Sequence, residues 1–193
     1  MTTLFETPRW QVRGLQEDEL PALQALFEAN PGYFELVGGR PPVPGAARQV
    51  FDDRPPPELS YRTQWCAGAF DRSGALRGLL IVVADLVVER VWHTALFFVD
   101  GPLRGTGAAT ELHAGLQAWA EGHGVAWLRL GVVVGNTVAE RFWARCGYVQ
   151  VRERPLINDS GQHKTVRVMI KPLGGHTLDD YLSQVPRDRP DAA

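Results

Sequence analysis

The sequence is poor in cysteine, and its two cysteines share no recognisable pattern. Cys66 and Cys146 form no C-x-x-C pair and stand at no metal-ligand spacing from a histidine. A secreted, disulfide-stapled domain is therefore not expected, and we predict two free, buried thiols in a reducing compartment. No metal site is predicted either, because no ligand spacing links the four histidines His113, His123, His163 and His176.

Long hydrophobic runs are missing as well. The longest, residues 79–86, is interrupted by Asp85 and is far shorter than the roughly 20 residues that cross a bilayer. The first ten residues, MTTLFETPRW, contain no basic stretch followed by an apolar one, so no signal peptide is predicted. We therefore expect a soluble, cytoplasmic protein with no membrane partner.

The chain also lacks an excess of charge of either sign. It carries 20 Lys and Arg against 22 Asp and Glu, a formal net charge of −2. Non-specific binding to nucleic acid depends on a bulk positive charge that this composition does not supply. No nucleic-acid partner is predicted, although a local basic site remains compatible with the composition.

What the sequence does contain is the composition of one ordinary folded domain. Of the 193 residues 45% are hydrophobic and 22% are charged. A chain of this size buries roughly 70% of its unfolded surface, which is enough for a core without a staple. We expect one domain over residues 1–173, followed by a polar C-terminal tail over residues 174–193 that includes a short docked segment.

Hydrophobic periodicity predicts a mixed α/β or α+β fold. A segment rich in Gly, Pro and Arg, residues 38–57, is expected to be functional or mobile, with a short helix near 46–51. Helices are predicted over 18–30, 106–121 and 137–146. Strands are predicted over 10–15, 64–71, 76–86, 91–99, 125–134, 148–154 and 165–171.

The most informative stretch is residues 96–110, LFFVDGPLRGTGAAT, in which a strand leads through a glycine-containing loop into a helix. The first turn of a helix leaves backbone N–H groups without partners, and the helix dipole places partial positive charge there. Small residues let a phosphate approach these donors, and Arg104 adds a charge-assisted contact. The stretch therefore predicts a phosphate or pyrophosphate site.

Two common nucleotide-binding patterns do not fit this loop. A Walker A loop needs a Lys after its glycines, and none follows here. A Rossmann fingerprint needs a third glycine where Thr110 stands, and an acidic residue at the end of the next strand where Asn136 stands. Neither an ATPase-type nor a dinucleotide-type site is therefore expected.

A third pattern does fit. Residues 104–109, Arg-Gly-Thr-Gly-Ala-Ala, match the R/Q-x-x-G-x-G/A signature of the GCN5-related N-acetyltransferases. Residues 136–148, NTVAERFWARCGY, resemble the N-x-x-A-x-x-[FL]-[YW]-x-x-x-G-[FY] segment of the same family. The resemblance implies a mixed, mostly antiparallel sheet flanked by helices, in which the central parallel strands 91–99 and 125–134 diverge to admit acetyl-CoA.

The resemblance also assigns the cofactor-binding residues. The strand before the loop would bind the pantetheine amides through its backbone, and an N–H near Phe98 or Val99 would polarise the thioester carbonyl. Asn136 would contact the pantetheine arm. The cofactor set implied in this way is Phe97, Phe98, Val99, Arg104, Gly105, Thr106, Gly107, Ala108, Ala109, Asn136, Phe142 and Trp143. Of these, Phe142 and Trp143 would flank the thiol end, and core packing competes with that role.

The acid and base are not obvious. The resemblance places Trp143 where many family members have a tyrosine acid, and Gly131 where some have a carboxylate base. His93 is the remaining candidate for a base, since alternation places it on one strand face with Val91, Ala95 and Phe97. A core histidine bonded to a neighbour is the competing interpretation.

Residues 30–51 lie where the family places the cover of the acceptor pocket. Tyr33, Phe34, Glu35 and Arg40 are candidates to line that pocket, and Glu35 with Asp52 or Asp53 would suit a cationic amine. The resemblance implies direct transfer of acetyl to a primary amine of a small molecule or peptide. Two alternatives remain open: a non-catalytic acyl-CoA sensor or scaffold domain, and an edge strand or tail that would allow a homodimer.

Overall fold

The computed structural model describes residues 2–158 and 160–192. Eight strands form one sheet in the order β1-β2-β3-β4-β5-β6-β8-β7. Their bounds are β1 (Thr3–Glu6), β2 (Gln11–Gly14), β3 (Thr63–Phe70), β4 (Leu76–Ala84), β5 (Val91–Val99), β6 (Trp127–Val133), β7 (Val149–Ile157) and β8 (His163–Pro172). Within the described chain β5 and β6 form the one parallel pair, and the other neighbours are antiparallel.

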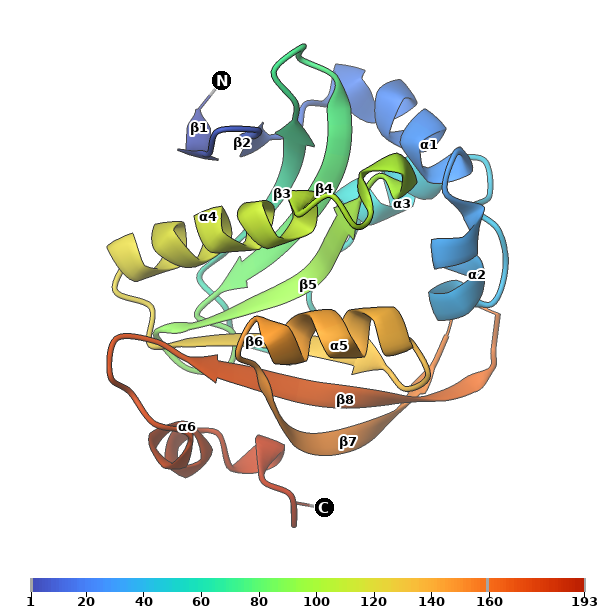
Figure 1. Ribbon diagram of the computed structural model, residues 1–193. Helices are drawn as coiled ribbons and strands as arrows, with labels where there is room; N and C mark the ends of the chain where they lie inside the picture. The colour runs from blue at the N-terminus through green and yellow to red at the C-terminus, as the bar shows by residue number, and fades with distance from the viewer. Residues whose placement is uncertain (1, 159, 193) are drawn as a thin grey trace.

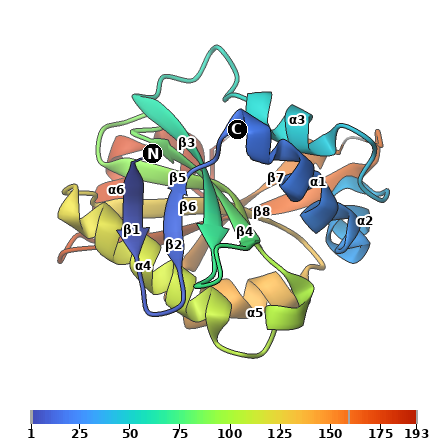
Figure 2. The same ribbon diagram turned by 90° about the horizontal axis from the view of Figure 1, so that it is seen from above.

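Helices cover both faces of the sheet (Figures 1 and 2). One face carries α4 (Ala108–Gly122) and α5 (Thr137–Arg145), and the other carries α1 (Leu20–Glu28), α2 (Pro31–Gly38), α3 (Ala46–Asp52) and α6 (Leu178–Gln184). Three short 3₁₀ turns complete the set: η1 (Glu17–Glu19), η2 (Gly101–Leu103) and η3 (Pro186–Asp188). This is the mixed, mostly antiparallel sheet with flanking helices that the sequence predicts.

The long helices form where the apolar spacing predicts them. In α4 the residues Ala108, Leu112, Leu116 and Ala120 are buried along one stripe against β4, β5 and β6. In α1 the buried positions are Leu20, Leu23, Leu26 and Phe27, which pack on the opposite face. At about 25 cal/mol per Å² of apolar area, such stripes supply most of the energy that fixes a helix on a sheet.

The sequence did not predict α2. The Asn-Pro-Gly at residues 30–32 ends α1 as expected, but Pro31 then occupies the first turn of a new helix, where its missing N–H costs nothing. Gly39, with φ of +80°, ends α2 in the left-handed conformation that glycine adopts most easily. The edge strand β1 and the helix α6 are also absent from the predicted elements, because four- and seven-residue elements give little periodicity.

The C-terminal residues form part of the domain core. Tyr181 is fully buried in α6 and packs in a cluster with Val91, Trp127 and Ile170 of the central strands. Asp188 is fully buried as well. The segment expected to be a polar tail thus docks through α6 and η3 against β6, β7 and β8, because one apolar face and one buried ion pair anchor it.

Among the described residues no helix is long and apolar enough to cross a membrane.

The separation of β5 from β6 positions the site. The parallel pairing of β5 with β6 runs from Val91 opposite Trp127 to Thr94 opposite Leu130 and goes no further. Beyond Thr94 the two strands separate toward their carboxyl ends, and α4 and α5 both begin at that edge (Figure 1).

Candidate active site

A β-bulge in β5 shapes the centre of the sheet. Ile81 of β4 lies opposite Leu96, but the next residue, Val82, lies opposite Thr94, so that Ala95 has no partner. An inserted residue reverses the alternation of the side chains that follow it. His93 and Phe97 therefore lie on opposite faces of the sheet. The prediction that they share one face was wrong, because simple alternation does not take a bulge into account.

The bulge also divides the aromatic side chains of β5 between the two faces. Phe97 packs beside α5, with its ring centroid 5.1 Å from that of Trp143. Phe98 is buried on the opposite face against Phe27 and Tyr33. His93 faces the same side as Phe98. The side chains of Phe97 and Phe98 thus serve core packing, which leaves their backbone for any contact in the gap.

The backbone of β5 offers free groups toward β6. The Asp100 N–H donates to the Arg77 carbonyl at 2.8 Å, in register with the pairing of β4 and β5. In an antiparallel ladder hydrogen-bonded residues alternate, so Phe98 bonds to β4 whereas Phe97 and Val99 direct their N–H and C=O groups away from it. These groups face the gap beyond Thr94. Phe98, predicted as a backbone contact, is corrected: its N–H and C=O belong to the ladder.

The loop that follows β5 needs glycine at two positions. Gly105 and Gly107 have φ of +76° and +83°, and a Cβ at either position would meet no atom within 4 Å. The conformation requires these glycines, while the surrounding space stays open for a ligand. Gly107 is the N-cap of α4, and the Glu111 N–H already bonds to its carbonyl.

The first turn of α4 presents its backbone donors outward. No described residue accepts from the N–H groups of residues 107–110, and the loop around them is exposed. Residues 104–107 are exposed, whereas the side chain of Ala108 is buried and that of Ala109 half-buried. The geometry is that of an anion cradle, with an exposed arginine, Arg104, at its entrance.

Residues from the start of the chain hold this loop in place. The Arg9 guanidinium donates to the Thr106 carbonyl at 3.1 Å and pairs with Glu111 of α4 at 3.1 Å. The Trp10 indole donates to the Ala108 carbonyl at 3.0 Å. These contacts join residues about a hundred positions apart, and no pattern in the sequence predicts them.

Asn136 lies at the start of α5, across the gap from the cradle. Its side-chain oxygen accepts from the Ala139 N–H at 3.2 Å and so caps the helix. The side-chain NH₂ has no described partner and is available to a ligand. Asn136 therefore has a structural role as a helix cap, and the contact expected with the pantetheine arm stays a prediction.

The aromatic residues of α5 form a packed cluster. Trp143 is 6% exposed and lies within 5.2 Å, between ring centroids, of Phe97, Phe142 and Tyr148. Tyr148 is buried, with its hydroxyl 3.3 Å from Nε2 of His113, and burial raises its pKa well above the ordinary range. The raised pKa keeps the Tyr148 hydroxyl protonated at neutral pH, and both aromatic side chains pack in the core.

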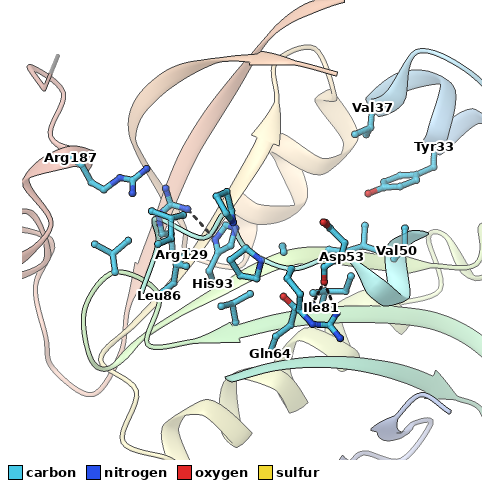
Figure 3. A pocket seen from close by; sticks show the side chains of 18 residues that line it. Tyr33, Val37, Val50, Asp53, Gln64, Ile81, Leu86, His93, Arg129 and Arg187 are labelled. Atoms are coloured by element: carbon cyan, nitrogen blue, oxygen red, sulfur yellow. Dashed lines mark hydrogen bonds between the residues drawn. The ribbon is translucent and has the colours of Figure 1, made fainter. Parts of the chain in front are cut away.

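A cavity of about 520 Å³ opens on the face opposite α4 and α5 (Figure 3). Its floor is formed by β3, β4, β5 and β6, and its walls by α2, α3, the segment 53–59 and η3. Tyr33 and Asp53, which were expected at an acceptor pocket, line it together with His93, whereas Phe34 and Arg40 do not. Glu35 and Asp52 are exposed and do not line it either, so the predicted acidic pair is not formed there.

His93 is held by a neighbour that can only donate. Nη1 of Arg129 lies 3.1 Å from Nδ1 of His93 (Figure 3), and Arg129 in turn pairs with Asp188 at 2.8 Å. Nδ1 must therefore accept, which places the proton of the neutral ring on Nε2. Burial and then the Arg129 charge lower the His93 pKa to about 3. The ring is a neutral donor to the cavity, with no free lone pair.

The phenol of Tyr33 also lines the cavity, and its pKa is raised. Burial raises the pKa of Tyr33 to about 12, and its ring stacks edge-on against Phe98 at 5.2 Å. Figure 3 shows the phenol oxygen directed into the cavity. Tyr33 is thus a neutral hydrogen-bonding group across the working pH range. Among residues 2–158 and 160–192 no cluster of three His, Cys, Asp or Glu side chains could hold a metal ion.

Comparison with known proteins agrees with this geometry. A family model described as acetyltransferase (GNAT) family matches residues 24–148, well over half of the chain. A sequence comparison with curated proteins finds no significant match.

Solved structures share the fold at low sequence identity. A GCN5-related N-acetyltransferase from Kribbella flavida is 22% identical, with 85% of this chain and 98% of that chain covered and a TM-score of 0.62. Spermidine N-acetyltransferase from Vibrio cholerae, in complex with CoA and spermine, is 16% identical over 86% and 96%, with a TM-score of 0.64. Ribosomal-protein-S18-alanine N-acetyltransferase from Escherichia coli is 16% identical over 87% and 96%, with a TM-score of 0.61. With the separated strands, the glycine loop and the family model in agreement, the chain belongs to the GNAT family of acetyltransferases.

Proposed function

We propose that the protein transfers an acetyl group from acetyl-CoA directly to a primary amine. The observation that carries the proposal is a continuous row of backbone N–H and C=O groups along one edge of β5, without protein partners in the described part of the chain. The row begins at the N–H groups of residues 107–110, follows the free backbone of Val99 and Phe97, and ends beside the cavity at Leu96.

The residues along this row fit the parts of acetyl-CoA. The cradle of α4, with Arg104, would hold the pyrophosphate through N–H groups and the helix dipole. Val99 and Phe97 would bond the pantetheine amides as an added strand does, and the Asn136 amide would donate to the same arm from the other side of the gap. The pattern of free donors is what this ligand requires.

The Phe97 N–H is the oxyanion donor in this arrangement. The cradle fixes the phosphate end near Val99, so the thioester lies further along β5, beside the bulge. There the Phe97 N–H faces the gap and would bond the carbonyl oxygen as it gains negative charge. The neutral amine nitrogen attacks the carbonyl carbon, the C–S bond breaks, and CoA leaves as a thiolate. The second proton, which the nitrogen loses as the amide forms, passes through water to that thiolate and gives the thiol of CoA.

No side chain near Phe97 takes up the amine proton in this proposal. His93 offers only an N–H, and Tyr148 and Trp143 are packed. The amine therefore loses its proton to water before it attacks, and catalysis rests on orientation and on the Phe97 N–H. The departing thiolate, with a thiol pKa near about 8.5, needs little help from an acid.

The test is binding followed by turnover. Calorimetric titration with acetyl-CoA, free CoA and NAD should give micromolar binding of the first two and none of the third. Mass spectrometry of a mixed amine panel with acetyl-CoA should then detect an acetylated product. Absence of CoA binding would overturn the proposal.

A second function, an acyl-CoA sensor or scaffold domain without turnover, is favoured by one specific observation. The groups that could act as acid or base near the gap are all engaged: Trp143 and Tyr148 in the core, and His93 with Arg129. Normal CoA binding with no acetylated product from any amine would select this alternative.

A further inference from the structure

The charged residues that line the cavity are mostly basic. They are the three arginines Arg54, Arg129 and Arg187, with a single carboxylate, Asp53. Arg54 is committed to the chain itself, because its guanidinium donates to the carbonyls of Phe51 and Asp53 at 2.9 and 2.7 Å. These contacts fix the position of the Arg54 guanidinium, whereas the two other arginines, Arg129 and Arg187, share one end of the cavity.

Arg129 and Arg187 lie at the same end of the cavity but differ in their partners. Arg129 is partly buried, with its side chain 12% exposed, and it gives two hydrogen bonds to Asp188, at 2.8 and 3.3 Å. Arg187 is exposed, and its guanidinium has no partner in the part of the chain that the structure describes. Figure 3 shows the two side chains facing each other beside His93, across the cavity from Tyr33.

Two further arginines, Arg152 and Arg154, lie near this end of the cavity, where Asp188 is a shared carboxylate partner. Asp188 also accepts from Arg154 at 2.6 Å, while Arg152 is bonded to the backbone carbonyls of Arg187 and Ala192. Burial, and then the charges of Arg187, Arg129 and Arg152, lower the pKa of Arg154 although Asp188 opposes them. Among the described residues Asp188 is the only salt-bridge partner of these four arginines, which leaves a local excess of positive charge.

We infer that the acceptor amine carries a carboxylate or phosphate group, which Arg187 binds at the end of the cavity between β6 and η3. The inference rests on the proposed acetyl transfer, and it specifies the acceptor of that reaction. Arg187 offers the planar pair of donors that binds either anion in a bidentate way. The His93 Nε2–H, beside it, is a further donor to the same group.

This placement orients the acceptor along β5. With its anionic group at Arg187, the molecule extends past His93 and Ala95 to Leu96, where its amine reaches the bulge next to Phe97. The excess of arginine opposes a polycationic acceptor such as the spermine named for the Vibrio cholerae structure. A polycationic acceptor would have suited the expected acidic pair of Glu35 with Asp52 or Asp53, a pair that does not line the cavity.

The experiment compares matched acceptors at saturating acetyl-CoA, with products measured by mass spectrometry. One set has 4-aminobutyrate, its amide and putrescine, which differ only in a negative, neutral or positive end. A second set has phosphoethanolamine and ethanolamine. In at least one set we expect kcat/KM for the anionic member to exceed that of the neutral member at least tenfold. The set that shows the preference distinguishes carboxylate from phosphate.

Substitutions of Arg187 test whether this residue causes the preference for anionic acceptors. Arg187→Ala should remove the preference by raising KM for the anionic acceptor at least tenfold, with little change in kcat, and Arg187→Lys should restore part of it. Arg189→Ala is the matched control, because Arg189 is exposed two residues away and bonds to the Leu182 carbonyl outside the cavity. Thermal unfolding of each variant shows that the fold is intact.

The outcomes separate this inference from the proposed function. Acetylation with a preference for neutral or cationic amines, or a preference that survives Arg187→Ala, would overturn the inference and leave acetyl transfer standing. If no amine is acetylated, titration of the CoA-bound protein with 4-aminobutyrate and phosphoethanolamine decides: Arg187-dependent binding supports the anion site, and no binding refutes it.

Discussion

Arg129 and His93 stand on the two parallel strands of the sheet, opposite each other in register, and Nη1 of one lies 3.1 Å from Nδ1 of the other. The guanidinium is fixed from behind by Asp188, whose side chain is fully buried. Because an arginine cannot accept a hydrogen bond, this contact decides the tautomer of the histidine. The candidate base of the sequence analysis thereby becomes a donor group of the acceptor cavity.

The first prediction concerns His93→Gln, which keeps an acceptor for Arg129. We expect kcat/KM to fall less than tenfold, because removal of a true general base costs about 10² to 10⁴ in rate. In both proteins kcat/KM should rise with pH and level off near the ordinary pKa of the acceptor amine. Profiles recorded with two acceptors whose amines differ in pKa provide the measurement. A profile that stays fixed when the acceptor changes, and disappears in His93→Gln, would restore His93 as the base.

The second prediction concerns the anion cradle. Gly107→Glu should weaken the binding of CoA at least tenfold, because it places a carboxylate where the pyrophosphate is expected. Gly107→Glu introduces a negative charge and also the backbone strain of a side chain at φ of +83°. Only the charge should weaken the binding of CoA.

Gly124→Glu provides the matched control for Gly107→Glu. Gly124 has φ of +73°, a Cβ there would also meet no atom within 4 Å, and it lies beyond the opposite end of α4. Both variants should lose similar stability in urea unfolding, while only Gly107→Glu loses CoA affinity by calorimetry. Equal affinities for CoA in the two variants would refute the cradle.

The features that the sequence predicted correctly are local ones. The amphipathic stripe of α4 and the separation of 91–99 from 125–134 follow from short patterns and from a family motif. Gly105 and Gly107 adopt the left-handed conformations that such a loop suggests. The stripe and the two glycine conformations depend on residues within one or two turns of each other, a range over which a single sequence carries information. The separation of the two strands joins distant residues and was predicted only through the resemblance to a known family.

The features that were missed depend on residues far apart in the chain. The bulge at Ala95 is set by the register of β4 against β5, and nothing in the sequence around Ala95 marks it. The contact of Arg129 with Asp188 joins positions 59 residues apart, so the aspartate looked like part of a solvated tail. The tautomer of His93 and the basic end of the cavity both follow from that pair.

The third prediction concerns stability in mild acid. Burial holds the pKa of His93 near about 3, and burial followed by the Lys171 charge holds that of His113 near about 4, against an ordinary value of 6.5. Below about pH 6.5 these two histidines therefore bind protons in the unfolded chain but stay neutral in the folded chain. The free energy of unfolding falls as the pH decreases for this reason. Each histidine contributes a slope of up to about 1.4 kcal/mol per pH unit.

Urea unfolding between about pH 5 and pH 7 measures this slope. His93→Gln and His113→Gln should each flatten it by up to about 1.4 kcal/mol per pH unit, and the two effects should add. The exposed His163, replaced by Gln, serves as the control for the substitution itself. A slope unchanged in both buried variants would show that neither ring is kept neutral by the fold.

The last prediction concerns Asp188 and the C-terminal segment. Asp188 accepts hydrogen bonds from Arg129, Arg154 and Tyr181, all of which are wholly or partly buried. Its removal leaves the Arg129 charge in the interior without a partner, which costs about 3–5 kcal/mol in comparable buried pairs. We expect Asp188→Ala to lower the free energy of unfolding by that amount, and the His93 ring to lose its fixed donor.

Asp180→Ala separates this effect from the loss of a helix cap. Asp180 is exposed and only closes the capping box of α6 with Thr177, so its removal should cost much less stability than the removal of Asp188. Burial raises the pKa of Asp188, but hydrogen bonds and charge from Arg129 lower it further and leave it below its ordinary value. The stabilisation by Asp188 is therefore complete above about pH 4 and lost as the pH falls below that, whereas Asp188→Ala should show no such loss. If Asp188→Ala proves no more costly than Asp180→Ala at neutral pH, the C-terminal segment is an appendage and the basic end of the cavity is not held by it.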